Sequence, residues 1–184
     1  MNKLAFSVVS SSGEESDYPA RELNKHSAET RGWQSPRFCS YPQTLILQLH
    51  DPNATINQLQ ILSHQSKIPT KIEVVIGRGG SSFANCPEVK RLGYISLDSN
   101  ERSNYQAREL KSVHVNADRT SFVKLVVHRC HVNKLNAYNQ VGLIAVNCLG
   151  VSTTVAGNVP VESYRSAAHG PSGGPAGALG GPGG

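Results

Sequence analysis

Residues 32–50 (GWQSPRFCSYPQTLILQLH) constrain the fold most, because they join the single tryptophan of the chain to a strictly alternating segment. In that segment Leu45, Leu47 and Leu49 would share one face of an extended strand. A large indole that fills the space between two sheets, followed by a proline-bounded loop and an alternating strand, is typical of a β-sandwich core. We therefore expect Trp33 between two sheets.

The rest of the chain reads as further short strands separated by Gly, Pro, Asn and Asp. With the central strand at 44–50, the expected strands are 4–10, 56–64, 71–77, 92–97, 110–116, 122–128 and 140–149. About eight short strands without a long amphipathic helix predict an all-β, jelly-roll β-sandwich. Residues 20–30 fit either a helical turn or an irregular strand.

The same patterns predict which side chains form the core. The alternating strands and the Trp33 loop, which Pro36 and Pro42 restrict, supply the expected core residues. These are Trp33, Phe38, Leu47, Leu125, Val127 and Ile144.

Composition divides the 184 residues into one domain at 1–150 and a Gly/Pro-rich tail or linker at 151–184, which we expect to be flexible. No apolar run approaches the roughly 20 residues that span a bilayer, and the N-terminus does not read as a signal peptide. Four widely spaced cysteines, without a CxxC pair, are expected to be reduced. These features predict a cytoplasmic protein that does not act at a membrane.

The charge is mildly basic, with a formal net charge of +5 and a pI of about 9.1. Between residues 119 and 161 the chain carries Arg119, Lys124, Arg129 and Lys134 and no acidic residue. This pattern suggests a basic face for an acidic partner, and an ordinary solvated surface is the alternative. It lacks the dense basic stripe and interleaved aromatics of a nucleic-acid-binding protein.

The sequence offers no catalytic, cofactor or metal site. His128, Cys130 and His131 form an H-x-C-H pattern, but neighbouring strand residues point to opposite faces, and no second ligand pair stands at a zinc-like spacing. Cys39 has no recognisable histidine partner, and the chain has neither a GxSxG elbow nor a phosphate-binding GK[ST] loop. We expect a protein that is not an enzyme.

The loop at 129–139 (RCHVNKLNAYN) is the best candidate for a binding site, because loops at the end of a sandwich commonly carry function. The candidate partner-binding residues are Arg129, His131, Lys134, Asn136 and Tyr138. The alternative for its asparagines is turn capping through side-chain hydrogen bonds. Residues 66–69 (SKIP) also match the S-x-I-P motif by which proteins bind end-binding proteins at microtubule plus ends, although its position between two strands argues against a working motif.

Longer blocks of the sequence resemble the N-terminal jelly-roll domain of the family of the centrosomal protein of 104 kDa. The blocks include GWQSPRFCSYPQ at 32, LQILSHQSKI at 59, RLGYISLDSNERS at 91, ARELKSVHV at 107 and HVNKLNAYNQVGLIAVNCLG at 131. The resemblance implies a discoidin-like or galactose-binding-like jelly roll. Full-length members of the family add a coiled coil, a tubulin-binding TOG domain and zinc fingers, and the chain ends in its Gly/Pro-rich segment where the coiled coil is expected.

The resemblance also implies a role at centrioles, basal bodies and the tips of ciliary or flagellar microtubules. The expected function is therefore a protein-interaction module whose partner is tubulin, with its acidic tails, or another ciliary-tip protein. Two alternatives remain open: a lectin-like glycan-binding module, and an adaptor that recruits a partner into a larger complex. The resemblance supplies no binding residues.

Overall fold

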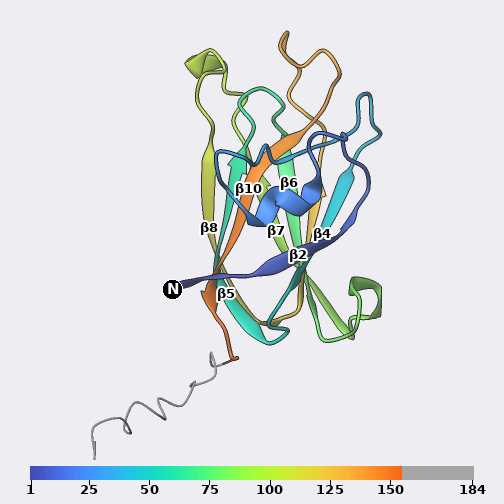
Figure 1. The fold of residues 1–184 in the computed structure, drawn as a ribbon, viewed down its shortest axis with the longest axis vertical. Helices are drawn as coiled ribbons and strands as arrows, with labels where there is room; N and C mark the ends of the chain where they lie inside the picture. The colour runs from blue at the N-terminus through green and yellow to red at the C-terminus, as the bar shows by residue number, and fades with distance from the viewer. Residues whose placement is uncertain (155–184) are drawn as a thin grey trace, which may run out of the picture. The chain divides into compact units, whose positions relative to one another are not determined.

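Two antiparallel sheets pack face to face in the computed structural model, which describes residues 1–154 (Figure 1). One sheet has the order β1 (Asn2–Leu4), β10 (Gly142–Val151), β5 (Ala54–Ser63) and β8 (Leu110–Thr120), and β3 (Trp33–Gln34) pairs with β10. The other has the order β2 (Phe6–Ser11), β4 (Gln43–Leu49), β9 (Phe122–Val127), β6 (Lys71–Arg78) and β7 (Glu88–Ser96). Within residues 1–154, three 3₁₀ turns lie in the connections between strands: η1 (Ala20–Asn24), η2 (Phe83–Asn85) and η3 (Glu101–Ser103). The predicted jelly-roll sandwich is confirmed.

Two segments differ in detail from the expected elements. The strand expected at 4–10 is two strands, because the chain leaves the first sheet after Leu4 and enters the second at Phe6. The side chains of Leu4 and Phe6 are both buried, so the segment that crosses between the sheets covers one side of the core. The ambiguous segment at 20–30 begins with η1, whose Leu23 is fully buried.

The core lies between the sheets and includes the alternating strand. Leu45, Leu47 and Leu49 are 0%, 0% and 3% exposed. Trp33 is fully buried, and its indole Nε1 donates a hydrogen bond to the carbonyl oxygen of Gly13 at 2.9 Å. Leu125 and Val127 of β9 lie in the same core.

Gly32 allows Trp33 to reach this position. Its φ of +78° lies in the left-handed region, and a Cβ atom there would stand 2.3 Å from the carbonyl oxygen of Leu143 on β10. Any other residue would therefore push the chain away from the strand with which β3 pairs.

The expectation that Phe38 belongs to the core is wrong, because its side chain is 69% exposed. Phe38 has a φ of +52°, and its backbone N–H donates to the carbonyl oxygen of Tyr138. The loop thus turns Phe38 towards the 129–139 loop at the end of the sandwich. Ile144 is buried at 4% exposure, but it lines a surface pocket and lies outside the main core cluster.

The ordered fold extends past residue 150, where we expected the tail to begin. Val151 ends β10, and the Asp51 carboxylate accepts hydrogen bonds from Ser152 Oγ at 2.7 Å and from the backbone N–H groups of Thr153 and Thr154. From residue 155 onward the expected tail lies outside the described residues. Within residues 1–154, no helix is both long and apolar enough to cross a bilayer.

Candidate protein-interaction site

Four connections meet at one end of the sandwich, drawn at the top of Figure 1: residues 35–42, 64–70, 97–109 and 128–141. We call this end the loop end. Residues 129–139 (orange in Figure 1) form its most prominent loop. The backbone of this loop is tied to its neighbours, because the N–H of His131 donates to Ile68 and the N–H of Phe38 donates to Tyr138.

Two of the candidate binding residues hold the loop in place. Asn136 is 3% exposed; its side-chain amide donates to the carbonyl oxygen of Gln140 at 2.7 Å and accepts from the N–H of Gln140 at 3.0 Å. The prediction of Asn136 as a partner-contacting residue is therefore wrong: it caps the turn. His131 is half-buried, with Nε2 2.9 Å from the carbonyl oxygen of Leu97, so its ring positions the loop.

The residues of the H-x-C-H pattern point to different places. Cys130 is buried in the core, His131 contacts Leu97, and His128 Nε2 lies 3.4 Å from Glu73 on β6. Burial raises the pKa of the Cys130 thiol. The arrangement therefore favours a structural cysteine over a metal ligand or a thiolate nucleophile.

Exposed aromatic and aliphatic side chains gather at the loop end. The rings of Phe38 and Tyr138 meet edge to face, with centroids 5.7 Å apart, and the Arg37 guanidinium lies 4.4 Å from the Tyr138 centroid. Val132 is 81% exposed and, with Phe38 and Arg129, lines a small depression of about 260 Å³. We define the aromatic patch as Arg37, Phe38, Arg129, Val132 and Tyr138.

Tyr41 forms part of that depression and supports the patch from below. Its hydroxyl donates to the carbonyl oxygen of Asn139, which links the 35–42 loop to the 129–139 loop. Burial, aided by hydrogen bonding to Cys39 and the proximity of Cys130, raises the pKa of Tyr41 far above its ordinary value. The phenol therefore stays protonated and acts as a fixed donor.

The basic residues of the acid-free segment do not form one face. Arg129 and Lys134 are exposed at the loop end, whereas Arg119 lies beside Asp118 at the end of β8, and Lys124 on β9 lies near the Phe83 ring. The structure adds Arg37, which no pattern in the sequence marks as a binding residue. Its ion pair with Glu15, at 3.4 Å, is largely exposed and contributes little to stability.

The S-x-I-P residues belong to the folded core of the loop end. Ile68 is 2% exposed and Ser66 6% exposed. The carbonyl oxygen of Lys67 accepts from the N–H of Gly142, and that of Ile68 from His131. A partner that needs an extended, accessible S-x-I-P segment would have to unfold this turn.

Comparison with known proteins relates this chain to a single family. Residues 32–150 match the family described as "Centrosomal protein CEP104, N-terminal domain". The chain is 46% identical over 152 residues to the centrosomal protein of 104 kDa of Homo sapiens and 43% identical to that of Mus musculus. Each match covers 81% of this chain and 16% of the relative, so the chain spans about a sixth of the relatives' length.

Solved structures with the same fold have low sequence identity. The N-terminal domain of the single-strand break repair protein XRCC1 matches with a TM-score of 0.62 at 20% identity, covering 80% of this chain and 99% of that one. A Clostridium perfringens module in complex with GalNAc-β-1,3-galactose matches with a TM-score of 0.60 at 16% identity, covering 81% and 100%. At these identities the likeness establishes the jelly-roll fold alone.

Proposed function

Because the chain belongs to the family of the N-terminal domain of the centrosomal protein CEP104, we propose that it is a non-enzymatic protein-interaction module of a microtubule-associated protein. In this proposal it acts in the cytoplasm, at the cytoskeleton, and specifically at centrioles, basal bodies and the tips of cilia or flagella. There it contributes to the assembly or regulation of microtubule tips.

The aromatic patch is the observation that carries this proposal. Isolated exposed apolar residues are common on proteins, but here an aromatic pair, a valine and two arginines share one surface. Aromatic residues and arginine are the residue types enriched at the energetic centres of protein interfaces. Hydrogen bonds hold the surrounding loops, so partner binding would order little additional chain.

The preferred partner is an acidic protein surface, and tubulin is the candidate. Arg37, Arg129 and Lys134 place three cations at the loop end, and only Arg37 among them forms an ion pair within residues 1–154. Opposite charge on a partner would accelerate encounter and favour this orientation.

Microtubule co-sedimentation of the 184-residue chain tests the proposal. Reversing two charges in the double variant Arg129→Glu/Lys134→Glu should weaken binding by about tenfold. Phe38→Ala, which keeps the charge, should also weaken binding, because it removes half of the aromatic pair. Matched controls on exposed positions elsewhere are Arg21→Glu/Lys90→Glu for charge and Val89→Ala for apolar area.

The outcomes distinguish tubulin from other partners. Equal losses in the patch and control variants would mean that nonspecific charge drives sedimentation, and would remove the patch from the proposal. If the chain does not sediment with microtubules but captures another protein from ciliated cells in a patch-dependent way, the adaptor alternative would replace tubulin binding. Glycan binding stays a prediction that a glycan array addresses.

A further inference from the structure

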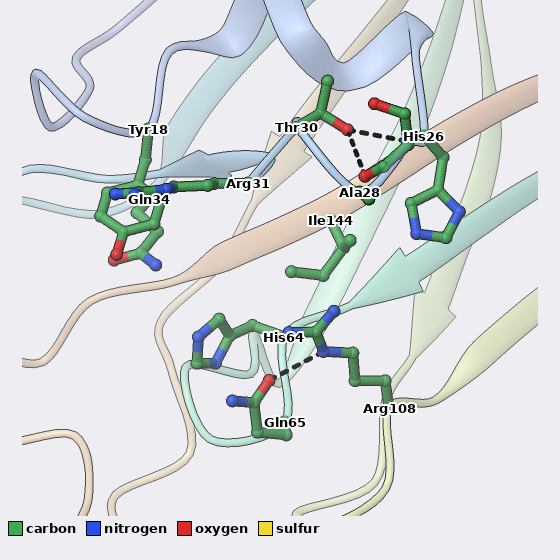
Figure 2. A pocket seen from close by; sticks show the side chains of 11 residues that line it. Tyr18, His26, Ala28, Thr30, Arg31, Gln34, His64, Gln65, Arg108 and Ile144 are labelled. Carbon is green, nitrogen blue, oxygen red and sulfur yellow. Dashed lines mark hydrogen bonds between the residues drawn. The ribbon is translucent and has the colours of Figure 1, made fainter.

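A second recess is lined partly by residues of the loop end and shares no lining residue with the depression at the aromatic patch (Figure 2). It has a volume of about 710 Å³ and lies between the chain at 26–31, the residues that follow β5 and Arg108, which precedes β8. Tyr18 and Gln34 flank it, and the apolar side chain of Ile144 contributes to its wall. We call it the basic pocket.

The titratable side chains of arginine and histidine that line this pocket are either cationic or neutral. Arg31, Arg108, His26 and His64 contribute to the lining, and none of the described residues that line it is an aspartate or a glutamate. Behind them, Lys67 Nζ donates to Gln34 Oε1 and lies 5.9 Å from the Tyr18 ring centroid. Among residues 1–154, none of the ion pairs involves Arg31, Lys67 or Arg108. In the described part of the domain these three side chains therefore have no ion-pair partner, although the Glu22 carboxylate accepts from the backbone N–H of Arg31 at 2.9 Å and the Glu15 carboxylate attracts Lys67 through space.

Hydrogen bonding leaves the pocket rich in donors and poor in acceptors. The side-chain oxygens of Gln65 and Gln34 already accept from Arg108 Nε, at 3.0 Å, and from Lys67. His64 Nδ1 accepts from the backbone N–H groups of Ser66 and Lys67, both at 3.1 Å, so its proton resides on Nε2. Within residues 1–154 the guanidinium Nη groups of Arg108 and the Nε2–H of His64 form no hydrogen bond, so they are donors for a ligand.

The same surroundings keep His64 uncharged. Burial first, and then the nearby cations Lys67 and Arg108, lower the pKa of His64 to about 4. At neutral pH its imidazole is thus a neutral donor whose pKa reports on the local positive potential. A bound anion would offset that potential and raise the pKa of His64.

From this arrangement we propose that the basic pocket binds a carboxylate-rich segment of a partner protein. The two arginines come from different segments, one before β3 and one before β8; in Figure 2 the Arg31 side chain extends beside Tyr18 and Gln34, and Ile144 lies near Arg108. Separated cations and an apolar side chain in one lining suit a peptide with several carboxylates and aliphatic stems. A single phosphate is better matched by donors that converge on one point.

Fluorescence anisotropy of a labelled poly-glutamate peptide against the 184-residue chain tests this proposal independently of microtubule binding. Arg108→Gln and Arg31→Gln should each weaken binding by about three- to tenfold, because each removes a charge-assisted contact. The matched control is Lys90→Gln, which removes one exposed charge on β7, and it should leave binding unchanged. Melting temperatures equal to that of the parent chain confirm that each variant is folded.

Two further measurements make the test specific. Titration of His64 followed by NMR should show its pKa rising when the poly-glutamate peptide is present, and not rising in Arg108→Gln to the same extent. A phosphoserine peptide serves as the competing ligand. The proposal is overturned if poly-glutamate does not bind, if Lys90→Gln loses as much affinity as Arg108→Gln, or if only the phosphoserine peptide binds at the pocket.

Discussion

Replacing Asp51 by asparagine should destabilise the domain at neutral pH. The Asp51 side chain is 8% exposed, and its carboxylate accepts from Ser152 Oγ, from the N–H groups of Thr153 and Thr154, and from the N–H of Asn53 at 3.0 Å. A hydrogen bond to a charged acceptor contributes about 1.5–3 kcal/mol. Because one carboxylate serves several donors that water can reach after substitution, the contributions do not add, and we expect a total loss of about 2–3 kcal/mol.

The effect should depend on pH with a defined sign. Although burial alone would raise it, the hydrogen bonds from Ser152 and from the backbone at 53, 153 and 154 hold the pKa of Asp51 below its ordinary value of 3.8. A carboxylate with a lowered folded-state pKa contributes stability that is fully present above the unfolded-state value. That contribution is lost as the pH falls through the folded-state value, so the gap between parent and Asp51→Asn should shrink below about pH 4.

Urea unfolding of the 184-residue chain at pH 7, and at steps down to about pH 3, measures both predictions. For a domain of this size, the loss corresponds to a melting temperature lower by about 4–12 °C. Asp17→Asn, at an exposed aspartate, is the control and should change little. A variant within about 0.5 kcal/mol of the parent at pH 7, or a gap that stays constant on acidification, would refute the argument.

Four further perturbations test other parts of the fold. Trp33→Ala should lower the free energy of unfolding by about 3–5 kcal/mol, because it leaves a cavity and removes the hydrogen bond from the indole to the Gly13 carbonyl, and a fully stable variant would contradict the burial of the indole. Gly32→Ala should cost about 1–3 kcal/mol or more by denaturant titration, whereas unchanged stability would show that β10 can move away. Asn136→Ala should cost about 1–3 kcal/mol, since it leaves two buried backbone groups of Gln140 unsatisfied. The comparison is Asn133→Ala, whose side chain donates to the carbonyl oxygen of Ser66 and accepts from the exposed N–H of Leu135; the loss should be smaller, because water can replace a bond at an exposed group. Cys148 is fully buried with a pKa raised to about 12, so a thiol reagent should leave it unlabelled until the domain unfolds, and labelling of native protein would contradict its position.

The strands could be predicted because their periodicity is local. Alternation in β4 identifies Leu45, Leu47 and Leu49 as one face without knowledge of any other segment. The direction of a loop side chain is not local. Phe38 is hydrophobic and stands between two prolines, but in the folded loop it has a positive φ and bonds through its backbone to Tyr138, a hundred residues later, and its side chain lies outside the core.

In the candidate sites, too, local sequence patterns predict some features, and others depend on contacts that only the folded chain makes. The 129–139 loop could be selected by its composition, but the structural role of Asn136 depends on bonds that only the folded turn creates. The basic pocket had no sequence signal, because Arg31, His64 and Arg108 come from three distant segments. Their proximity follows from the pairing of β5 with β8 and of β3 with β10.

The attachment of residues 152–154 to Asp51 gives the domain a polarity. The turn that contains Asp51 follows β4 and precedes β5, and it lies at the pole of the sandwich opposite the loop end (Figure 1). A surface or tag coupled after Thr154 is therefore attached to the domain at the pole opposite the loop end. Every immobilised copy would then present the aromatic patch outward, so a binding measurement in that format should sample a uniform orientation, and a coupling made through lysines would not.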